Sequence, residues 1–535
     1  MRKNFIFICA LFLVVSCTSD RDTSSKLRVM LLKQDYKSAE DFAMSNDFYD
    51  EKRNVLLKEL ERGNIFYLEG KYKQAFLHLY QAKQISDELY TTSISKKIVA
   101  TAISTQLDNY YGERYERSLI RFYLSLVNYN LYITGKYEAY KDQNGNKIPE
   151  QKLTENERRQ HLSVARANVL EWDSLLTSYK NELAGESTYK RDLTQKIWAA
   201  YIHKQMGSSN DKQIALQLYK DAKDTLLKNY NLYPTFNDKS DDFDKNYSKL
   251  AHLPIAEVQK KYVSPTIFAN DLIAFIDKEI AQMESRRDEN LVVLVKDGIL
   301  NKKKAKRVVI GFGISEAALR SREKGDVDII PIVYPATQLG VLYGDPFLLT
   351  LGLTAPTFEF EVPSVPDYVN NAVLTGILSK NGKEVSRFPI VITNPLNDIA
   401  QKEINDKFAG QIVKTAGITI TKHIAAIIAA KVAYNAMINQ KMNPLIALIS
   451  TMGTYKAATM AINASAEADL RNWSSLPYNI RFGTANVPQG EYDFTIKAHY
   501  VRENKDDIFY KHPSKVVIKG EQNFLDLNIG WKEQK

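Results

Sequence analysis

The spacing of hydrophobic residues divides the chain into two parts. From Lys26 to about Arg287, apolar residues recur every three or four positions, and proline is nearly absent until Pro234. That period is typical of amphipathic helices. From Asn290 onward the chain carries short β-branched runs bounded by Gly and Pro, and Thr357–Val362 alternates strictly. The pattern predicts a multidomain α+β protein, in which an all-helical N-terminal half precedes a β-rich domain.

The helical period returns inside the β-rich part. Two segments rich in Ala, Gly, Ser and Thr, Asp398–Gln440 and Asn443–Arg471, predict a two-helix insertion. Charged or polar residues interrupt both segments, at Lys422, His423, Lys431 and Lys456. Neither segment therefore carries the apolar run of about 18 residues that is typical of a membrane span. We expect two closely packed helices that cap a sheet, rather than a membrane hairpin. After them, a Pro-Gly turn and the alternating strand in Val487–Ala498 are typical of a β-sandwich.

One segment of the helical half has the spacing of a tetratricopeptide repeat. Its small residues allow two antiparallel helices to pack closely, and the pattern comprises Gly63, Gly70, Tyr72, Ala75, Leu79 and Ala82. Gly135 follows Gly70 by about two repeat lengths, and Ala215, Tyr219 and Ala222 repeat the spacing of Ala75, Leu79 and Ala82. We predict a tetratricopeptide-like solenoid, with a generic helical bundle as the alternative. Such a solenoid offers a concave surface that holds a partner protein.

The N-terminus carries a signal for export. Two basic residues precede the apolar segment Phe5–Val15, which is too short to span a bilayer. The stretch Val14–Cys17 resembles a bacterial lipobox, in which the cysteine thiol receives a diacylglyceryl group. An ordinary secretory signal with a chance cysteine is the alternative. We expect residues 1–16 to be a signal peptide and Cys17 to carry the lipid anchor.

The residues after Cys17 bear on location. No Asp follows the cysteine, so by resemblance to lipoprotein sorting rules we expect the outer membrane. We favour the periplasmic face over the cell surface, where a host contact is the alternative. Residues 17–27 are polar at their start and predict a lipidated tether.

Composition excludes several classes of chemistry. The only cysteines are Cys9 and Cys17, so the mature chain has no free thiol for disulfides, thiolate metal sites or nucleophilic catalysis. The formal charge of +9 over 535 residues is too mild for a nucleic-acid partner. The one basic cluster, Asn301–Arg307, reads as a solvated loop between two strands.

A compact pattern follows the Ala-rich helices. It has the form Asp-x-Arg-x-Trp-x-x-Leu-Pro and comprises Asp469, Arg471, Trp473, Leu476 and Pro477. On a helix C-terminus, Asp469 and Arg471 can pair or bond exposed carbonyls, and Pro477 turns the chain out of helix. We favour a structural corner over a ligand clamp.

Catalytic motifs are missing from the sequence. There is no G-x-S-x-G elbow, no Walker loop and no H-E-x-x-H pair. We therefore expect no enzyme activity, no catalytic residue, no metal site and no cofactor. Paired carboxylates depend on the fold, so an envelope enzyme or a glycan-binding protein, with its site in the C-terminal β domain, stays as the alternative.

Taken together, these segments resemble a family of uncharacterised bacterial lipoproteins, conventionally described as tetratricopeptide-like in their N-terminal half. The likeness rests on the lipobox, Tyr110–Tyr132, Asn290–Gly298, the Ala-rich helices, the Asp469–Pro477 motif and Asn486–Ala498. It implies this domain order but no activity. Members are sometimes encoded beside lipoproteins that activate penicillin-binding proteins, which suggests a role in envelope or peptidoglycan assembly.

These observations predict a lipid-anchored envelope scaffold that binds an unidentified envelope protein through its helical repeats. The expected divisions are a signal peptide (1–16), a lipidated tether (17–27), a helical repeat domain (28–287), the first part of the β-rich domain (288–395), a two-helix insertion (396–472) and the second part of the β-rich domain (473–535).

Overall fold

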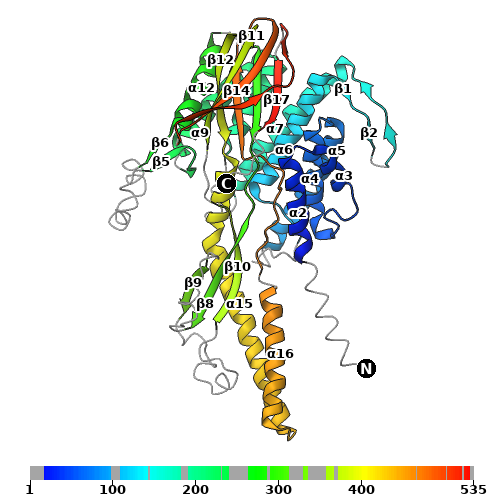
Figure 1. Ribbon diagram of the computed structural model, residues 1–535, viewed down its shortest axis with the longest axis vertical. Helices are drawn as coiled ribbons and strands as arrows, with labels where there is room; N and C mark the ends of the chain where they lie inside the picture. The colour runs from blue at the N-terminus through cyan, green and yellow to red at the C-terminus, as the bar shows by residue number, and fades with distance from the viewer. Residues whose placement is uncertain are drawn as a thin grey trace.

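The computed structural model describes most of the chain from Cys17 onward. The described residues are 17–97, 109–142, 145–181, 189, 191–229, 232–239, 263–285, 289–312, 329–334, 357–366, 371–464, 467–501, 503–520 and 523–529. Figure 1 shows a helical part beside a curved sheet, and two long helices that extend away from both. The predicted signal peptide lies outside the described residues.

The helical part is a row of antiparallel pairs. Its helices are α2 (Cys17–Leu32), α3 (Tyr36–Ala43), η1 (Lys52–Asn54), α4 (Val55–Leu68), α5 (Tyr72–Lys97), α6 (Arg114–Thr134), α7 (Glu155–Asn181), α8 (Leu193–Met206), α9 (Ser209–Asn229) and α12 (Ile267–Glu284). The pairs are α4 with α5, α6 with α7 and α8 with α9; α5 also contacts α6, and α7 contacts α8. Two-stranded ribbons lie in the connections, formed by β1 (Lys136–Tyr137) with β4 (Gln151–Lys152), β2 (Tyr140–Lys141) with β3 (Lys147–Ile148), and β5 (Asn237–Lys239) with β6 (Val263–Pro265).

Glycines permit the tight geometry of the first pair. Gly70 lies between α4 and α5 with a φ of 74°, a left-handed conformation that costs glycine little. Within α4, a Cβ atom on Gly63 would lie 2.6 Å from Cγ of Leu79 on α5. The two helices therefore approach too closely for any side chain at Gly63. A tetratricopeptide solenoid over the whole row stays a prediction.

The first helix replaces the predicted tether. Residues 17–27 belong to α2, and Asp20 and Leu27 are buried against the body. Oδ1 of Asp20 accepts a 2.8 Å hydrogen bond from Asn54, and Arg28 donates a 2.6 Å hydrogen bond to the carbonyl of Leu300. The prediction of a tether is wrong because its polar residues find partners that are distant in sequence.

The β-rich part contains one eight-stranded sheet that curls into a half-barrel. Its strands are β7 (Leu291–Asp297), β11 (Ala372–Lys380), β12 (Lys383–Asn394), β13 (Asn479–Ala485), β14 (Gly490–Tyr500), β15 (Lys505–Lys511), β16 (Val516–Ile518) and β17 (Asn523–Ile529). The order is β15-β14-β11-β12-β13-β7-β17, with β16 beside β14. All pairs are antiparallel except β17 with β7. The sheet thus takes strands from both sides of the helical insertion, and the curled sheet replaces the predicted sandwich.

The two faces of this sheet belong to different cores. On β7, Val292 and Leu294 join the core shared with the helical part, whereas Leu291 and Val293 join a second core on the opposite face of the sheet. This alternation is the period of two of a strand. The α-helices α8 and α12 contact β12 on the shared side. The predicted boundary near residue 287 therefore crosses one continuous core, and the helical and β-rich parts pack as a single body.

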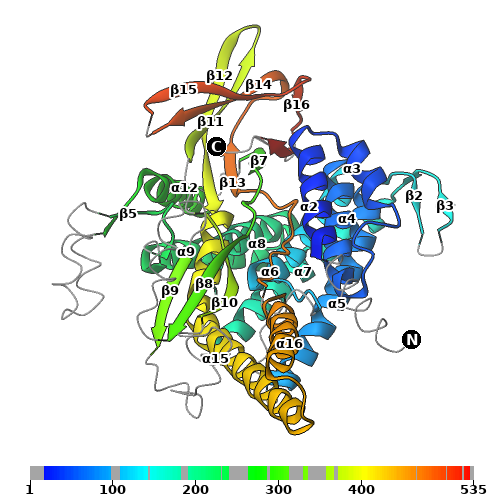
Figure 2. The same cartoon turned by 60° about the horizontal axis from the view of Figure 1, so that its bottom comes forward.

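The insertion forms a long hairpin, α15 (Leu396–Asn439) with α16 (Pro444–Ala464), which we call the arm. The 44 residues of α15 correspond to a length of about 66 Å. Its first half packs on a three-stranded sheet of order β10-β8-β9, formed by β10 (Thr357–Ser364), β8 (Lys304–Phe312) and β9 (Ile329–Tyr334). The second helix packs along α15 and extends away from both sheets (Figures 1 and 2). The expectation that both helices cap a sheet is wrong for α16.

Candidate functional site

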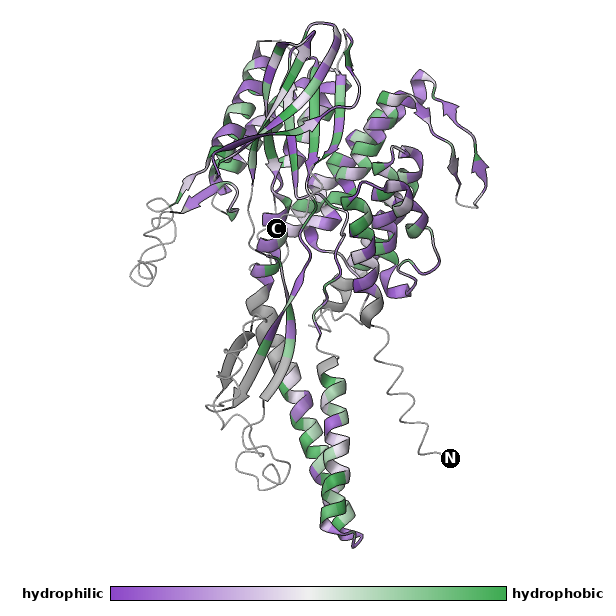
Figure 3. Cartoon of the chain, in the orientation of Figure 1, coloured by the Kyte–Doolittle hydropathy of each residue, from purple (hydrophilic) through white to green (hydrophobic). Residues whose placement is uncertain are grey.

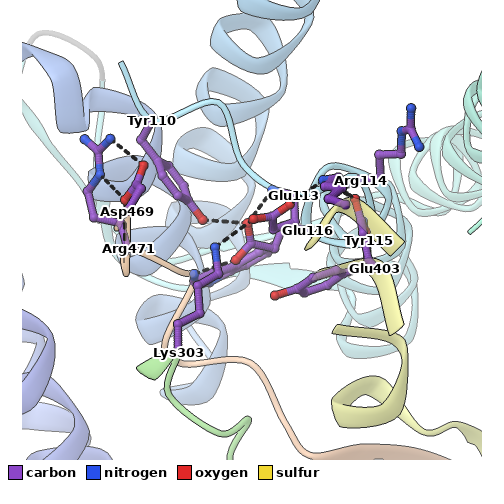
Figure 4. Close-up of polar contacts among 11 residues, drawn as sticks. Tyr110, Glu113, Arg114, Tyr115, Glu116, Lys303, Glu403, Asp469 and Arg471 are labelled. Carbon is purple, nitrogen blue, oxygen red and sulfur yellow. Dashed lines mark hydrogen bonds and ion pairs between the residues drawn. The ribbon is translucent and has the colours of Figure 1, made fainter. Parts of the chain in front are cut away.

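A buried network of charged side chains joins the helical part to the arm and to the small sheet (Figure 4). We call it the ionic junction. Its charged members are Glu113, Glu116, Lys303, Glu403, Lys407, Asp469 and Arg471. They come from the start of α6, the residue before β8, the first half of α15 and the loop after α16. Charges removed from water are costly unless they are paired and hydrogen-bonded, and each of these has a partner.

Glu113 lies at the centre of the junction. It is the N-cap residue of α6 and forms a capping box with Glu116. Its two carboxylate oxygens each accept a 2.7 Å hydrogen bond, one from Nζ of Lys303 and one from Nζ of Lys407. Burial alone would raise the pKa of Glu113, but the two ammonium groups outweigh it and hold the pKa well below its usual range. Glu113 is therefore ionised at neutral pH.

The arm binds the same helix end through Glu403. This carboxylate accepts hydrogen bonds from the backbone N–H groups of Arg114 at 3.0 Å and Tyr115 at 3.3 Å. It also accepts a 2.9 Å hydrogen bond from Lys407 on the next turn of α15. Free N–H groups and the helix dipole favour negative charge at a helix N-terminus. Glu403 thus fixes the base of the arm to the first turn of α6.

The loop after the arm is held by Glu116. One oxygen of Glu116 accepts a 2.7 Å hydrogen bond from the backbone N–H of Trp473, and the other accepts a 2.5 Å hydrogen bond from the hydroxyl of Tyr110. Burial raises the pKa of Glu116. The Trp473 side chain is fully buried and packs against the ring of Tyr123. The same helix, α6, therefore holds both the arm and the loop that follows it.

The Asp-x-Arg-x-Trp motif extends the network to α2. Asp469 and Arg471 form a two-point ion pair, with nitrogen–oxygen distances of 2.9 and 2.7 Å. Arg471 also donates a 2.9 Å hydrogen bond to Oδ1 of Asn54, and Asn54 bonds Asp20. The structure therefore contains the pairing that the sequence suggested. The helix does not reach the motif, however, because α16 ends at Ala464.

The end of the motif packs on α4. Glu61 accepts hydrogen bonds from the backbone N–H of Ser474 at 2.6 Å, from its hydroxyl at 2.7 Å and from the N–H of Ser475 at 3.2 Å. Burial raises the pKa of Glu61 to about 7, against the effect of these bonds. Leu476 is fully buried, and its carbonyl accepts a 2.8 Å hydrogen bond from Leu300. Pro477 follows directly, in the short turn before β13.

The predicted repeat residues lie on separate helices. Ala75, Leu79 and Ala82 are buried on α5, and Ala215, Tyr219 and Ala222 are buried on α9. Tyr72 begins α5, and Gly135 caps the end of α6 with a φ of 64°. Leu79 contacts Gly63 of α4, whereas the hydroxyl of Tyr219 donates a 3.2 Å hydrogen bond to Glu279 of α12, so the structure does not bring the two sets together. They are packing residues of the row and form no common site.

A cavity of about 370 Å³ opens where the row of helices meets the base of the arm. Lys180, Arg191, Thr225, Tyr233 and Pro395 are among its lining residues. A second cavity of about 250 Å³ shares Lys180, Arg191 and Thr225 with it. We call the two together the end groove. Its rim is charged, with the exposed cations Lys180 and Arg191 at the shared edge.

Sequence reasoning missed most of the ionic junction. Lys303 belongs to the basic cluster expected to be a solvated loop, but it is only 8% exposed, and that expectation is wrong for it. Its partner Glu113 is far away in sequence. The only local signal is the spacing of Glu113 and Glu116 at the start of a helix, which fits a capping box. Within the described ranges, no group of three or more His, Cys, Asp or Glu has the geometry to hold a metal ion.

No protein-family model matches this chain, and no curated protein matches it.

Proposed function

We propose that the protein is a lipoprotein of the bacterial outer membrane that holds an envelope protein with its row of helical pairs. The observation that carries the proposal is the row itself. Three antiparallel pairs follow one another from α4 to α9, and the close contact of Gly63 with Leu79 supports a tetratricopeptide-like first pair. Such rows offer extended surfaces whose usual role is to bind other proteins.

The packing of α2 supports an anchor close to the body. Asp20 is buried three residues after Cys17, so lipid on Cys17 leaves almost no slack between the membrane and the folded protein. A scaffold held in this way keeps its partner at a high local concentration near the membrane. Envelope or peptidoglycan assembly is the process that we assign to it.

The end groove is the part of the row that we assign to the partner. It lies between the last helical pair and the base of the arm, and Lys180 and Arg191 line its rim. The same groove is also lined by the acidic residues Asp173, Asp221 and Asp224. The rim therefore carries both signs of charge and favours a partner segment of mixed charge, whose acidic groups Lys180 and Arg191 would bind. Ala75, Ala82 and Ala215 are fully buried, so bulky changes there would disturb folding before they disturbed binding.

The test compares two double variants in a bacterium that produces the tagged protein. Lys180→Glu/Arg191→Glu reverses the charge of the two cations at the groove rim. Lys383→Glu/Lys515→Glu reverses two exposed cations on the half-barrel and is the matched control. After mild crosslinking and purification from membranes, we expect one stoichiometric companion with the wild type and the control, and its loss from the groove variant. A wild type without a companion, or a groove variant that retains it, contradicts the assignment.

The anchor is tested separately. A clickable fatty acid fed to the cells should label the wild type, and Cys17→Ser should lose both the label and membrane attachment. A Cys17→Ser protein that remains labelled would contradict lipidation at this residue.

A further inference from the structure

The outer surface of the arm is apolar and uncovered. On α16, Leu445, Ile446 and Ile449 are 65%, 56% and 62% exposed, and on α15 Val432 is 63% exposed. Within the part of the chain that the structure describes, Pro444–Ile462 is the one segment long and apolar enough to cross a membrane, and only 11% of it is buried. Figure 3 shows hydrophobic residues along the length of both helices. A helix that is apolar all round is normally buried in protein or lipid.

The arm also has an interior of its own. Ala430 and Tyr434 of α15 pack against Leu448, Met452 and Tyr455 of α16. This seam is separate from both cores of the body. The exposed side chains at positions 432, 445, 446 and 449 lie outside all three clusters, so the arm presents them to whatever surrounds it.

Several threonine hydroxyls along the arm bond carbonyl groups of their own helices. Thr421 donates to the carbonyl of Gly417 at 2.8 Å. On α16, Thr451 donates to Ala447 at 2.7 Å and Thr459 donates to Lys456 at 2.9 Å. Polar groups in a bilayer must be satisfied internally, and hydroxyls on a helix can meet this need by bonding the carbonyl three or four residues earlier. These bonds are compatible with a lipid environment.

Beyond Asp406, the arm carries charge of one sign. Between Asp406 and Glu467 the sequence has no acidic residue, and its charged residues are Lys407, Lys414, Lys422, Lys431, Lys441 and Lys456. Lysines next to an apolar helix are attracted to anionic lipid headgroups. The charge therefore favours a membrane with anionic lipids as the surface that covers the arm.

The base of the arm lies beside the start of α2. Arg21, in the first turn of α2, is 3.9 Å from Glu361 of β10, the strand on which α15 packs. Figures 1 and 2 show the arm extending on the side of the molecule at which α2 begins. The 21 residues of α16 correspond to about 31 Å, and the hydrocarbon core of a bilayer is about 30 Å thick.

We propose that the arm inserts into an anionic lipid bilayer, with α16 and the facing part of α15 crossing the hydrocarbon layer. The turn at residues 440–443 then lies at the far surface. The inference goes beyond the proposed scaffold and uses the anchor at Cys17 only for orientation. Lys422 and Lys441 lie near the two ends of the inserted part, where long side chains reach the headgroups. Lys431 on α15 and the exposed Lys456 on α16 lie near the middle of the inserted part, and both oppose insertion.

The test uses the chain from residue 17 with Cys17→Ser, so that no acyl group contributes to binding. Vesicles of phosphatidylcholine and phosphatidylglycerol in a 3:1 ratio are floated with the protein, with pure phosphatidylcholine as comparison. We expect binding to the anionic vesicles. Leu445→Ser/Ile446→Ser/Ile449→Ser should reduce the partition coefficient by at least about tenfold, because each residue contributes buried apolar area. Val385→Ser/Val501→Ser/Val517→Ser removes three exposed apolar residues from the half-barrel region and should leave it unchanged.

A further variant distinguishes insertion of the arm into the bilayer from adsorption to its surface. Lys456→Leu should strengthen vesicle binding if the arm enters the hydrocarbon, and weaken it if lysines only adsorb to the surface. The fluorescence emission of an environment-sensitive dye attached to Ile449→Cys should shift to the blue when vesicles are added. The emission of the same dye attached to Val385→Cys should not shift.

Three results overturn the proposal. The first is equal flotation of the α16 triple variant and the protein without these changes. The second is weaker vesicle binding by Lys456→Leu. The third is a protein that does not bind vesicles but forms arm-dependent dimers in water. The last result would identify a second copy as the occupant. The protein used in this test carries Cys17→Ser. A failure to bind vesicles therefore does not bear on lipid anchoring, which the fatty-acid labelling experiment tests separately.

Discussion

Nζ of Lys303 lies 2.7 Å from Oε1 of Glu113, although the two residues belong to different parts of the chain. Lys407 of the arm binds the other oxygen of the same carboxylate, also at 2.7 Å. The carboxylate of Glu113, at the start of α6, thus pairs with Lys303, which precedes the small sheet, and with Lys407 of the arm. The side chain of Lys303 is buried and that of Glu113 is 19% exposed, so this contact is shielded from water at its centre and fixes how the arm leaves the body.

Removing Lys303 should destabilise the protein strongly. Lys303→Met leaves the Glu113 carboxylate buried with one cation in place of two, and breaking a buried pair in this way costs about 3 kcal/mol. Chemical denaturation measures the loss. Lys303→Met/Glu113→Gln should cost less than the sum of the two single changes, because the unpaired charge is removed. Lys515→Met, at an exposed site, serves as the control, and strict additivity at the junction would contradict the pairing.

Glu61 should make stability depend on pH. Burial raises its pKa to about 7 from 4.5, so between these values the folded state binds more protons than the unfolded state. Its contribution is fully present below pH 4.5 and is lost as the pH rises through 7. The free energy of unfolding of the wild type, relative to Glu61→Gln, should fall by about 3 kcal/mol between pH 4.5 and 8. Equal slopes for the two proteins would show that Glu61 titrates normally.

The Asp469–Arg471 pair should not tolerate lysine. Arg471→Lys loses the two-point contact and the hydrogen bond to Asn54, which should cost about 2 kcal/mol because an ammonium group cannot reproduce the planar fork. Thermal unfolding measures the effect. Arg387→Lys changes a similar two-point pair with Glu384 that is exposed on the half-barrel, and no measurable change is expected there. Similar losses for both variants would mean that burial is not decisive.

The contact between Gly63 and Leu79 should couple the two positions. Gly63→Ala places a methyl group 2.6 Å from Cγ of Leu79, and overpacking of this kind costs about 1–3 kcal/mol. With Leu79→Ala already present, the added cost of Gly63→Ala should be much smaller. Gly453→Ala in α16 meets no atom within 4 Å and should be neutral or slightly stabilising. An unchanged cost in the Leu79→Ala background would contradict the close approach.

Local patterns identified most elements but few of the functional contacts. The period of three to four residues places helices such as α4 to α9, and alternation places strands such as β10 and β14, because side chains on one face share one environment. The repeat spacing also singled out Gly63 and Leu79, which meet across adjacent helices. The predictions of a polar tether, a β-sandwich and two helices that cap a sheet were wrong. Each of these features depends on which surfaces of the folded chain meet.

The sequence by itself determined the order of helices and strands, the candidate anchor at Cys17 and the absence of acidic residues from the arm beyond Asp406, because these follow from local composition. Only the tertiary structure decided that Lys303 is buried against Glu113, that α2 packs onto the body and that the sheet curls into a half-barrel. It also decided that α16 lies outside every core of the body. Burial and pairing are set by residues hundreds of positions apart, and no periodicity within one segment records which distant partner it meets.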